Sequence, residues 1–236
     1  MNQASEFQTE LNNSIECYAM LKHPFYQLWS AGKLDVEVLR EYAKQYYAHV
    51  KAFPTYVSAT HSHCDDVVVR QMLLENLIEE ERGENNHPEL WMRFAEGLGL
   101  TRDEVKNAEL LPSTVDSVNR LKALTQSEDY RRGVAALYAY ESQIPEVAQT
   151  KRSGLKEFYG IEDSRAVSFF SVHEAADEWH RETELKVLSE ACDSDADRAE
   201  VVSAAAEASK ALWDFLTGVQ SAFIDPASCD SNAAAA

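Results

Sequence analysis

The sequence predicts an all-α protein that folds as a bundle of about seven helices. Helical periodicity of apolar residues covers nearly the whole chain, and no alternating pair of segments around a tight turn predicts a β-hairpin. The 236 residues include only 8 Gly and 6 Pro, and so few turn formers favour long helices over many short strands. We expect one domain over residues 1–225 and a disordered tail at 226–236.

Nine segments carry the helical pattern. They are 3–21, 34–61, 65–82, 86–98, 101–108, 114–125, 129–158, 163–190 and 196–223. Thr101 with Glu104, and Ser113 with Asp116, have the spacing of a capping box, in which each side chain satisfies a backbone N–H at a helix start. Four glycines mark expected helix ends or breaks: Gly32, Gly83, Gly99 and Gly160.

Composition excludes several classes of partner. The net charge of −18, from 40 acidic and 22 basic residues, argues against binding nucleic-acid phosphates and against docking on an anionic membrane. No apolar run approaches the ~18 residues of a transmembrane helix, and the polar start MNQASEFQTELNN does not have the pattern of a signal peptide. The four cysteines are scattered and form no CxxC pair, which fits reduced thiols. We therefore expect a cytoplasmic protein.

The segment HEAADEWH, residues 173–180, places ionisable side chains on an apolar helix face. Each helical residue advances by ~100°, so His173, Asp177 and His180 fall within roughly 60° of arc. Phe169 and Leu188 extend the same stripe, which is otherwise typical of a buried face. Burying three such groups without partners would cost several kcal/mol each, so a metal ion is the first candidate to satisfy them.

The segment IEEERGENNH, residues 78–87, offers a second set of metal-binding side chains. Glu80 and His87 are seven residues apart, about two helical turns, and face the same way if the helix continues through Gly83 and Pro88. Helical phase favours Glu80 slightly, because it lies nearest the apolar side. The assignment remains open among neighbouring acids, which are Glu79, Glu81 and Glu84.

The segment AALYAYESQIP, residues 135–145, offers one further candidate metal ligand. Glu141 is the only acid in a run of small, apolar and aromatic residues, so we expect it in the interior, as a ligand or as a satisfied core acid. Pro145 removes the hydrogen bond to the Glu141 carbonyl and is expected to bend the predicted helix 129–158 at this point.

Together these segments predict a site of three carboxylates and three imidazoles. Such a mixed oxygen and nitrogen set suits iron or manganese, and bridging carboxylates leave room for two divalent ions. The predicted ligands are Glu80, His87, Glu141, His173, Asp177 and His180. On the predicted helix 34–61, Tyr42, Tyr46 and His49 share one face. Core packing is the default interpretation of that face, although phenols beside a metal that activates dioxygen are potential electron donors.

Four segments resemble the CADD-like proteins, named for the chlamydial protein associating with death domains. They are HPFYQLWSAGKL at 23–34, YYAHVKAFPTYVSATHSHCDD at 46–66, YESQIP at 140–145 and HEAADEWH at 173–180. The similarity runs from about residue 15 to residue 225. This group belongs to the haem-oxygenase-like dimetal-carboxylate oxidases and is related to the PqqC and TenA proteins. The resemblance implies a single haem-oxygenase-like bundle without haem.

The resemblance also implies cofactors and roles for particular residues. It implies an Fe/Fe or Mn/Fe centre held by the six residues named above, with Glu80 chosen from the acidic run, and with O2 and an external reductant as co-reactants. It further implies synthesis of para-aminobenzoate for folate, in which an internal tyrosine supplies the ring and a lysine the amino group. The matching positions are Tyr26 in HPFYQLW and Lys151 in AQTKRSG, with Tyr42 as a second donor or a radical relay.

Such chemistry is plausible on physical grounds. A tethered substrate needs no association step, because proximity is built into the fold. Transfer of the Lys151 nitrogen requires a neutral amine, and burial near a dication would lower its pKa. Each polypeptide would then react about once.

Other functions remain open at this point. The chain could be a dimetal oxygenase for an external small molecule, or a PqqC-like oxidase without a cofactor. A TenA-like hydrolase would need a cysteine nucleophile, and no base partner is evident for Cys17, Cys64, Cys192 or Cys229. A different class is an adaptor for host death domains, which depends on a host-associated organism. Related bundles often pair, so we expect a homodimer.

Overall fold

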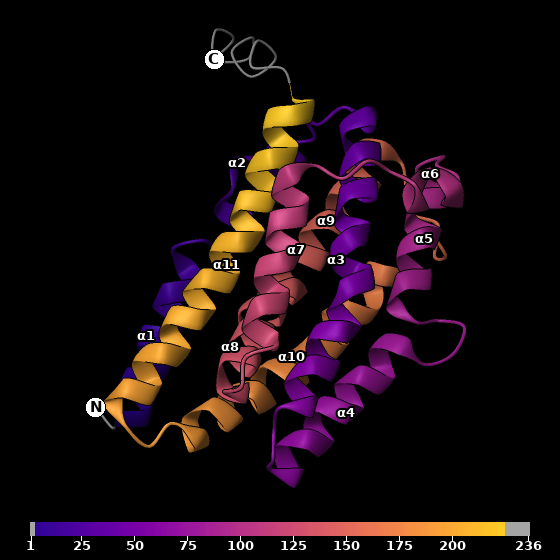
Figure 1. The fold of residues 1–236 in the computed structure, drawn as a ribbon. Coiled ribbons are helices and arrows are strands. Elements are labelled where there is room, and N and C mark those ends of the chain that lie inside the picture. The colour runs from indigo at the N-terminus through magenta and orange to yellow at the C-terminus, as the bar shows by residue number, and fades with distance from the viewer. Residues whose placement is uncertain (1–2, 225–236) are drawn as a thin grey trace, which may run out of the picture.

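The computed structural model describes the backbone of residues 3–224, with the side chains of residues 6–173 and 179–224. Within that part of the chain the regular elements are eleven α-helices and one short 3-10 helix, with no strand (Figure 1). The predicted all-α class is confirmed. The predicted tail, 226–236, lies outside the described residues, and the domain bounds stay a prediction.

The helices differ from the predicted segments mainly in number. In chain order they are α1 (Gln3–Glu16), η1 (Met20–Lys22), α2 (Pro24–Ser30), α3 (Val36–Ser62), α4 (Val67–Glu81), α5 (His87–Gly97), α6 (Arg102–Lys106), α7 (Pro112–Thr125), α8 (Tyr130–Glu141), α9 (Ile144–Tyr159), α10 (Ser168–Ala191) and α11 (Asp195–Phe223). The predicted helix 3–21 ends early, 129–158 is two helices, and α2 was not predicted.

The division of the predicted helix 129–158 follows from Pro145. Helix α8 ends at Glu141, and α9 begins at Ile144 with Pro145 in its first turn. Proline lacks the N–H that a helix interior requires, but the first turn leaves that group unbonded anyway. The expectation of one bent helix was therefore wrong. The break leaves Glu141 at the last position of α8.

Helix α2 is only seven residues long, which explains why periodicity did not reveal it. Pro24 occupies its first turn, and the side chain of His23 caps it by accepting a hydrogen bond from the Phe25 N–H at 3.1 Å. Phe25, Tyr26 and Trp29 are buried, whereas Pro24, Gln27 and Ser30 are exposed. Two turns are too few to establish a helical period in the sequence.

One of the two predicted capping boxes is present. Thr101 caps α6, and Glu104 accepts a hydrogen bond from the Thr101 backbone N–H at 2.7 Å. The box at Ser113 and Asp116 was wrong, because α7 already begins at Pro112 with Leu111 as its cap. A proline in the first turn set this helix start, rather than a capping side chain.

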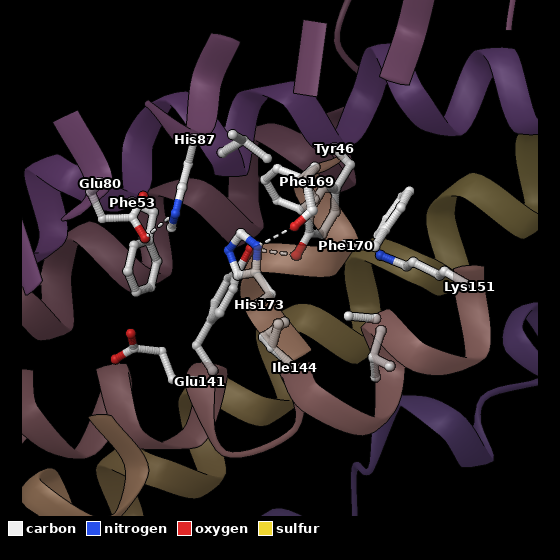
Figure 2. A pocket seen from close by; sticks show the side chains of 14 residues that line it. Tyr46, Phe53, Glu80, His87, Glu141, Ile144, Lys151, Phe169, Phe170 and His173 are labelled. Carbon is white, nitrogen blue, oxygen red and sulfur yellow. Dashed lines mark hydrogen bonds and ion pairs between the residues drawn. The ribbon is translucent and has the colours of Figure 1, made fainter. Parts of the chain in front are cut away.

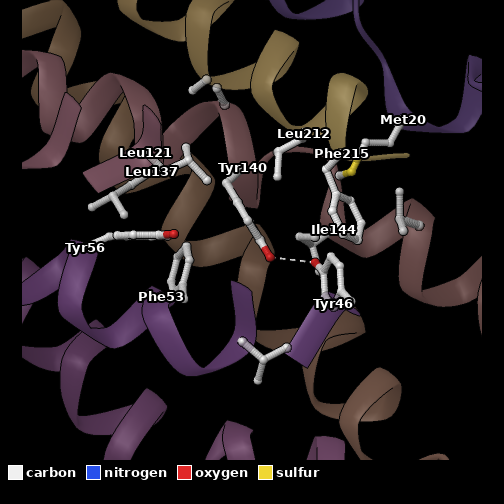
Figure 3. Packing of buried hydrophobic residues seen from close by; sticks show 14 of the residues in the cluster. Met20, Tyr46, Phe53, Tyr56, Leu121, Leu137, Tyr140, Ile144, Leu212 and Phe215 are labelled. Carbon is white, nitrogen blue, oxygen red and sulfur yellow. Dashed lines mark hydrogen bonds between the residues drawn. The ribbon is translucent and has the colours of Figure 1, made fainter. Parts of the chain in front are cut away.

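The helices pack in a bundle whose centre holds the site. Helix α11 packs against α7 and α8, α10 packs against α8 and α9, and α3 packs against α4, α5 and α7 (Figure 1). No helix in the described part of the chain is both long and apolar enough to cross a membrane. The core between the helices is rich in aromatic rings, among them Tyr46, Phe53, Tyr140 and Phe215 (Figure 3).

Candidate metal centre

Glu80 and His87 meet across a helix break. Helix α4 ends at Glu81, and α5 begins at His87, where the side chain of Asn86 caps it by accepting from the Glu89 N–H at 3.0 Å. The turn between the helices passes through Gly83, whose φ of +76° would be strained for a residue with a side chain. His87 Nδ1 lies 2.7 Å from Glu80 Oε1. The helix does not continue through Gly83, in agreement with the separate predicted segments 65–82 and 86–98, and the two side chains nevertheless face each other.

His173, on α10, joins this pair. Its Nδ1–H donates to the carbonyl of Phe169 at 2.7 Å, which leaves Nε2 to act as a ligand. Its ring centroid lies 4.3 Å from that of His87. Glu80, His87 and His173 each place one ligand atom within 4.8 Å of the others, and all three are buried (Figure 2). This spacing is compatible with a shared metal ion.

Glu141 and His180 form a second buried group. His180 Nδ1 lies 3.1 Å from Glu141 Oε1, and the Asn76 amide donates to the same oxygen at 2.9 Å. The other oxygen, Glu141 Oε2, is buried and has no hydrogen-bond partner among the described residues. The side chain of Asp177 lies outside the described residues, so its predicted role as a ligand stays a prediction.

The electrostatics of the two groups favour a bound cation. Burial raises the pKa of Glu80 well above its usual range, and the nearby charge of Glu141 raises it further. Burial lowers the pKa of His87 to about 4 and that of His173 to about 3, so both imidazoles are neutral and able to ligate a metal. A divalent ion would stabilise the buried carboxylates that are otherwise repelled by one another.

Sequence reasoning missed two residues that contact this centre. Asn76 precedes Glu80 by one turn of α4, and Glu184 follows His180 by one turn of α10; both have no exposed surface. The carboxyl group of Glu184 interacts electrostatically with that of Glu141. Helical phase would have found both residues, because positions four apart share a helix face. Glu79, weighed as an alternative ligand, lies with Oε2 3.3 Å from His180 Nε2.

Tyr26, Tyr42 and Lys151 also come together, from α2, α3 and α9. The Tyr26 and Tyr42 hydroxyl oxygens are 2.9 Å apart, and Lys151 Nζ donates to the Tyr42 oxygen at 2.7 Å. Burial lowers the pKa of Lys151 to about 7. The Trp29 indole donates to the Lys151 carbonyl at 3.3 Å, and a Cβ at Gly154 would lie 2.8 Å from the Trp29 ring, so glycine permits this approach of α2 to α9.

A small cavity lies between the metal-binding residues and Lys151. Its volume is about 30 Å³, and its lining includes Glu80, Glu141, His173, Tyr46 and Lys151. Figure 2 shows Glu80 and His87 at one end of the lining residues, Lys151 at the other, and Tyr46 between them. A water needs roughly 10–15 Å³ of such volume, so the cavity admits two or three molecules of that size. An aromatic substrate does not fit.

The described cysteines lie away from this cavity. Cys17 is exposed, whereas Cys64 and Cys192 are buried thiols whose pKa is raised by burial. None of the three is among the cavity-lining residues. Cys229 lies outside the described residues. The arrangement therefore offers no support for a cysteine nucleophile in this cavity.

Comparison with known proteins agrees with a metal-dependent redox site. The family model for iron-containing redox enzymes matches residues 40–213. The chain belongs to this family. It is 39% identical over 238 residues to a 4-aminobenzoate synthase of Nitrosomonas europaea, with 97% of each chain covered. It is 42% identical over 222 residues to a 4-aminobenzoate synthase of Chlamydia pneumoniae, covering 93% of this chain and 96% of the relative.

Solved structures show the same fold. A CADD-like protein from Nostoc punctiforme superposes with a TM-score of 0.78 at 17% identity, covering 95% of this chain and 100% of that one. The predicted haem-oxygenase-like bundle and the resemblance to CADD-like proteins are confirmed, as is the expectation of a redox enzyme.

Proposed function

We propose that this chain is an oxygen-activating dimetal enzyme that forms 4-aminobenzoate for folate synthesis from its own Tyr26 and Lys151. The observation that carries the proposal is the hydrogen-bonded row Tyr26–Tyr42–Lys151, which adjoins a cavity of metal-binding side chains too small for an aromatic substrate. The similarity of this chain to two 4-aminobenzoate synthases, at 39% and 42% identity, supports 4-aminobenzoate as the product.

The buried donor set fits divalent iron or manganese. Glu80, His87 and His173 would hold one ion, and Glu141, His180 and Asp177 a second, as Fe/Fe or Mn/Fe. The unpaired oxygen of Glu141 is the kind of buried acceptor that a cation satisfies. Ions held by these residues would supply the oxidising power of dioxygen, with electrons from an external reductant.

Tyr26 has the substituents that the product needs. In tyrosine the side-chain carbon lies para to the phenol oxygen, just as carboxyl and amino groups are para in 4-aminobenzoate. Breaking the Cα–Cβ bond of Tyr26 would release the ring with its future carboxyl carbon, and nitrogen would replace the phenol oxygen. Lys151 Nζ lies 5.3 Å from the centroid of the Tyr26 ring, so a donor nitrogen is already in place.

Lys151 is prepared for this role by burial. Nearly the whole side chain is shielded from water, and the pKa of about 7 makes a large neutral fraction available near neutral pH. A neutral amine is a nucleophile, whereas an ammonium is not. The expectation that burial lowers this pKa, made from the sequence, agrees with the structure.

Reconstitution with defined metals tests the proposal. The chain is loaded without oxygen with ferrous iron, with or without manganese, and then given O2 and a reductant. Intact-chain and peptide mass spectrometry should show a loss confined to Tyr26 and Lys151, with at most one 4-aminobenzoate released per chain. Oxygen uptake by a chain that stays unaltered would contradict self-consumption and indicate an external substrate.

A further inference from the structure

Glu79 is an exposed carboxylate that contacts a buried histidine of the candidate metal centre. Its Oε2 lies 3.3 Å from His180 Nε2, and the exposed fractions of the two side chains are 47% and 2%. Glu79 precedes Glu80 on α4, and Glu80 belongs to the group that would hold the first ion. The contact therefore connects a predicted ligand of the second ion to the protein surface.

The two ring nitrogens of His180 face different surroundings. Nδ1 lies 3.1 Å from Glu141 Oε1, an oxygen that also accepts a hydrogen bond from the Asn76 amide at 2.9 Å. Glu141 and Asn76 are both buried. Nε2 faces Glu79, which water reaches. The imidazole thus lies between a buried carboxylate and an exposed one.

The Nδ1 side of the ring is where a cation stabilises the fold most. Glu141 Oε2 is buried without a hydrogen-bond partner among the described residues, and Glu141 and Glu80 repel each other electrostatically. Two ligand atoms bound to one ion at about 2.1 Å and at a right angle lie about 3 Å apart. The 3.1 Å between His180 Nδ1 and Glu141 Oε1 matches that spacing. The geometry therefore favours Nδ1 as the nitrogen that binds the second ion.

We propose that Glu79 is a positioning residue for the second ion. It accepts the Nε2–H of His180 and so holds the ring in the tautomer whose Nδ1 is free to bind that ion. The proposal rests on the proposed function, which supplies the second ion. A histidine that binds a metal through one nitrogen commonly donates its other N–H to a carboxylate or a carbonyl, which fixes the ring and raises its basicity.

The outer partners of the two histidines on α10 differ in charge. His173 donates its Nδ1–H to the backbone carbonyl of Phe169, which is neutral. His180 faces a carboxylate instead. An ionised acceptor makes a stronger hydrogen bond than a neutral one, so Glu79 should strengthen His180 as a ligand more than Phe169 strengthens His173. The chain's affinity for the second ion should therefore depend on Glu79, and its affinity for the first ion should not.

Titration of the metal-free chain with ferrous iron, without oxygen and in competition with a chelator, measures both affinities. Glu79→Gln should weaken the binding of one equivalent about 10–100-fold and leave the other within about threefold of wild type. Glu79→Leu, which offers no acceptor at all, should weaken the same equivalent further. Glu81→Gln is the matched control, because the charge of Glu81 acts on Glu80 as that of Glu79 does, whereas the contact with His180 belongs to Glu79.

Nitrogen NMR of the zinc-loaded chain with isotopically labelled histidine reports the tautomers directly. Zinc has no redox chemistry and accepts the same nitrogen and oxygen ligands. We expect His180 to bind zinc through Nδ1 and to carry its proton on Nε2, and His173 to show the opposite arrangement. Single His→Gln variants assign the signals and show which equivalent His180 binds. A merely structural role of Glu79 would not change the signals of His180 alone.

Three outcomes would overturn the role of Glu79 and leave the proposed function standing, because wild type still binds two ions in each of them. Binding of zinc through His180 Nε2 would make Glu79 a ligand instead of an outer partner. Equal losses in Glu79→Gln and Glu81→Gln would reduce the effect to net charge. Unchanged affinities in Glu79→Gln and Glu79→Leu would remove Glu79 from the site.

A fourth outcome would contradict the proposed function itself. Wild type might as well be offered iron alone or iron together with manganese, and binding of only one ion in both cases would exclude a centre of two ions. The role of Glu79 at a second ion would then fall with it.

Discussion

Lys151 Nζ lies 2.7 Å from the hydroxyl oxygen of Tyr42, although 109 residues separate the two in the chain. The contact joins α9 to α3, and Tyr42 in turn contacts Tyr26 of α2. None of the three helices contains this arrangement by itself. The row of polar groups therefore requires that the three helices pack together. In the packed bundle all three side chains are buried.

Tyr26→Phe should abolish 4-aminobenzoate formation and leave metal binding intact. The variant keeps the ring but loses the oxygen that the proposed amination replaces, and it gives up one buried hydrogen bond, worth about 1 kcal/mol in the free energy of unfolding. Product and bound metal are measured on the same sample. The control is Tyr56→Phe, which changes a buried tyrosine on a different helix, α3, and should keep full product. Full product from Tyr26→Phe would move the ring source to Tyr42 or to an external substrate.

Lys151→Met should stabilise the metal-free protein in a pH-dependent manner. Lys151 has a pKa of about 7 in the fold and about 10.4 when unfolded. At and below pH 7 the ammonium of Lys151 is solvated only in the unfolded chain, which favours unfolding of the wild type. Replacing Lys151 should therefore raise the free energy of unfolding by on the order of 4 kcal/mol. Between pH 7 and 10 the unfolded state binds more protons than the folded state, so the free energy of unfolding of the wild type rises by about 1.4 kcal/mol per pH unit. The difference in stability between Lys151→Met and wild type shrinks accordingly.

Chemical denaturation at several pH values measures that difference. The titratable groups facing Lys151 are Tyr26, Tyr42, Tyr46 and His173. The raised pKa values of Tyr26 and Tyr42, and the pKa of about 3 at His173, lie outside the pH window used. Lys156→Met, at an exposed position of the same helix, is the control and should show no such trend. A difference that does not change with pH would contradict the lowered pKa.

Divalent metal should stabilise the chain through Glu80. Addition of ferrous iron or manganese without oxygen, at about 100 times the dissociation constant, should raise the free energy of unfolding by about 2.7 kcal/mol. Glu80→Gln removes a carboxylate ligand and should lose most of this gain, whereas the exposed neighbour Glu81→Gln should keep it. Thermal unfolding with and without metal gives the comparison. Equal gains in both variants would exclude Glu80 as a ligand.

Asn76→Leu should weaken metal binding although Asn76 is not a predicted ligand. Its amide donates to Glu141 at 2.9 Å and so orients that carboxylate. Loss of such a partner typically costs about 10–100-fold in metal affinity. Metal titration monitored by competition with a chelator measures the change, with Glu75→Gln on the exposed side of α4 as the control. Unchanged affinity would show that Glu141 is held without Asn76.

Helical phase and one glycine together predicted much of the metal centre. Glu80 and His87 lie on segments predicted as separate helices, 65–82 and 86–98, and they were expected to face the same way only if a helix continued through Gly83. They meet instead because the chain turns at Gly83 between α4 and α5. Periodicity detects which residues avoid water, and this holds across the break.

Helical phase could not predict that Tyr26, Tyr42 and Lys151 lie together. Tyr26 lies on a helix of only seven residues, and Lys151 looks like any surface lysine in the sequence, so both were identified through the resemblance alone. Their contact depends on the approach of α2 to α9 at Gly154, which is a tertiary feature. Tyr46 was interpreted as a core residue, and only its place at the cavity wall distinguishes it from its neighbours.

The complete burial of Tyr26 has a consequence for the lifetime of the polypeptide. Its ring has no exposed surface and packs among Phe25, Trp29 and Tyr42. Under the proposed function, a chain that has lost this ring would keep a void in its place, and losses of this size from a core cost about 3–5 kcal/mol. Such a loss is a large part of the stability of an ordinary domain. Used chains would thus unfold far more often than fresh ones, which exposes them to cellular proteases and returns their amino acids to the pool from which new copies are made.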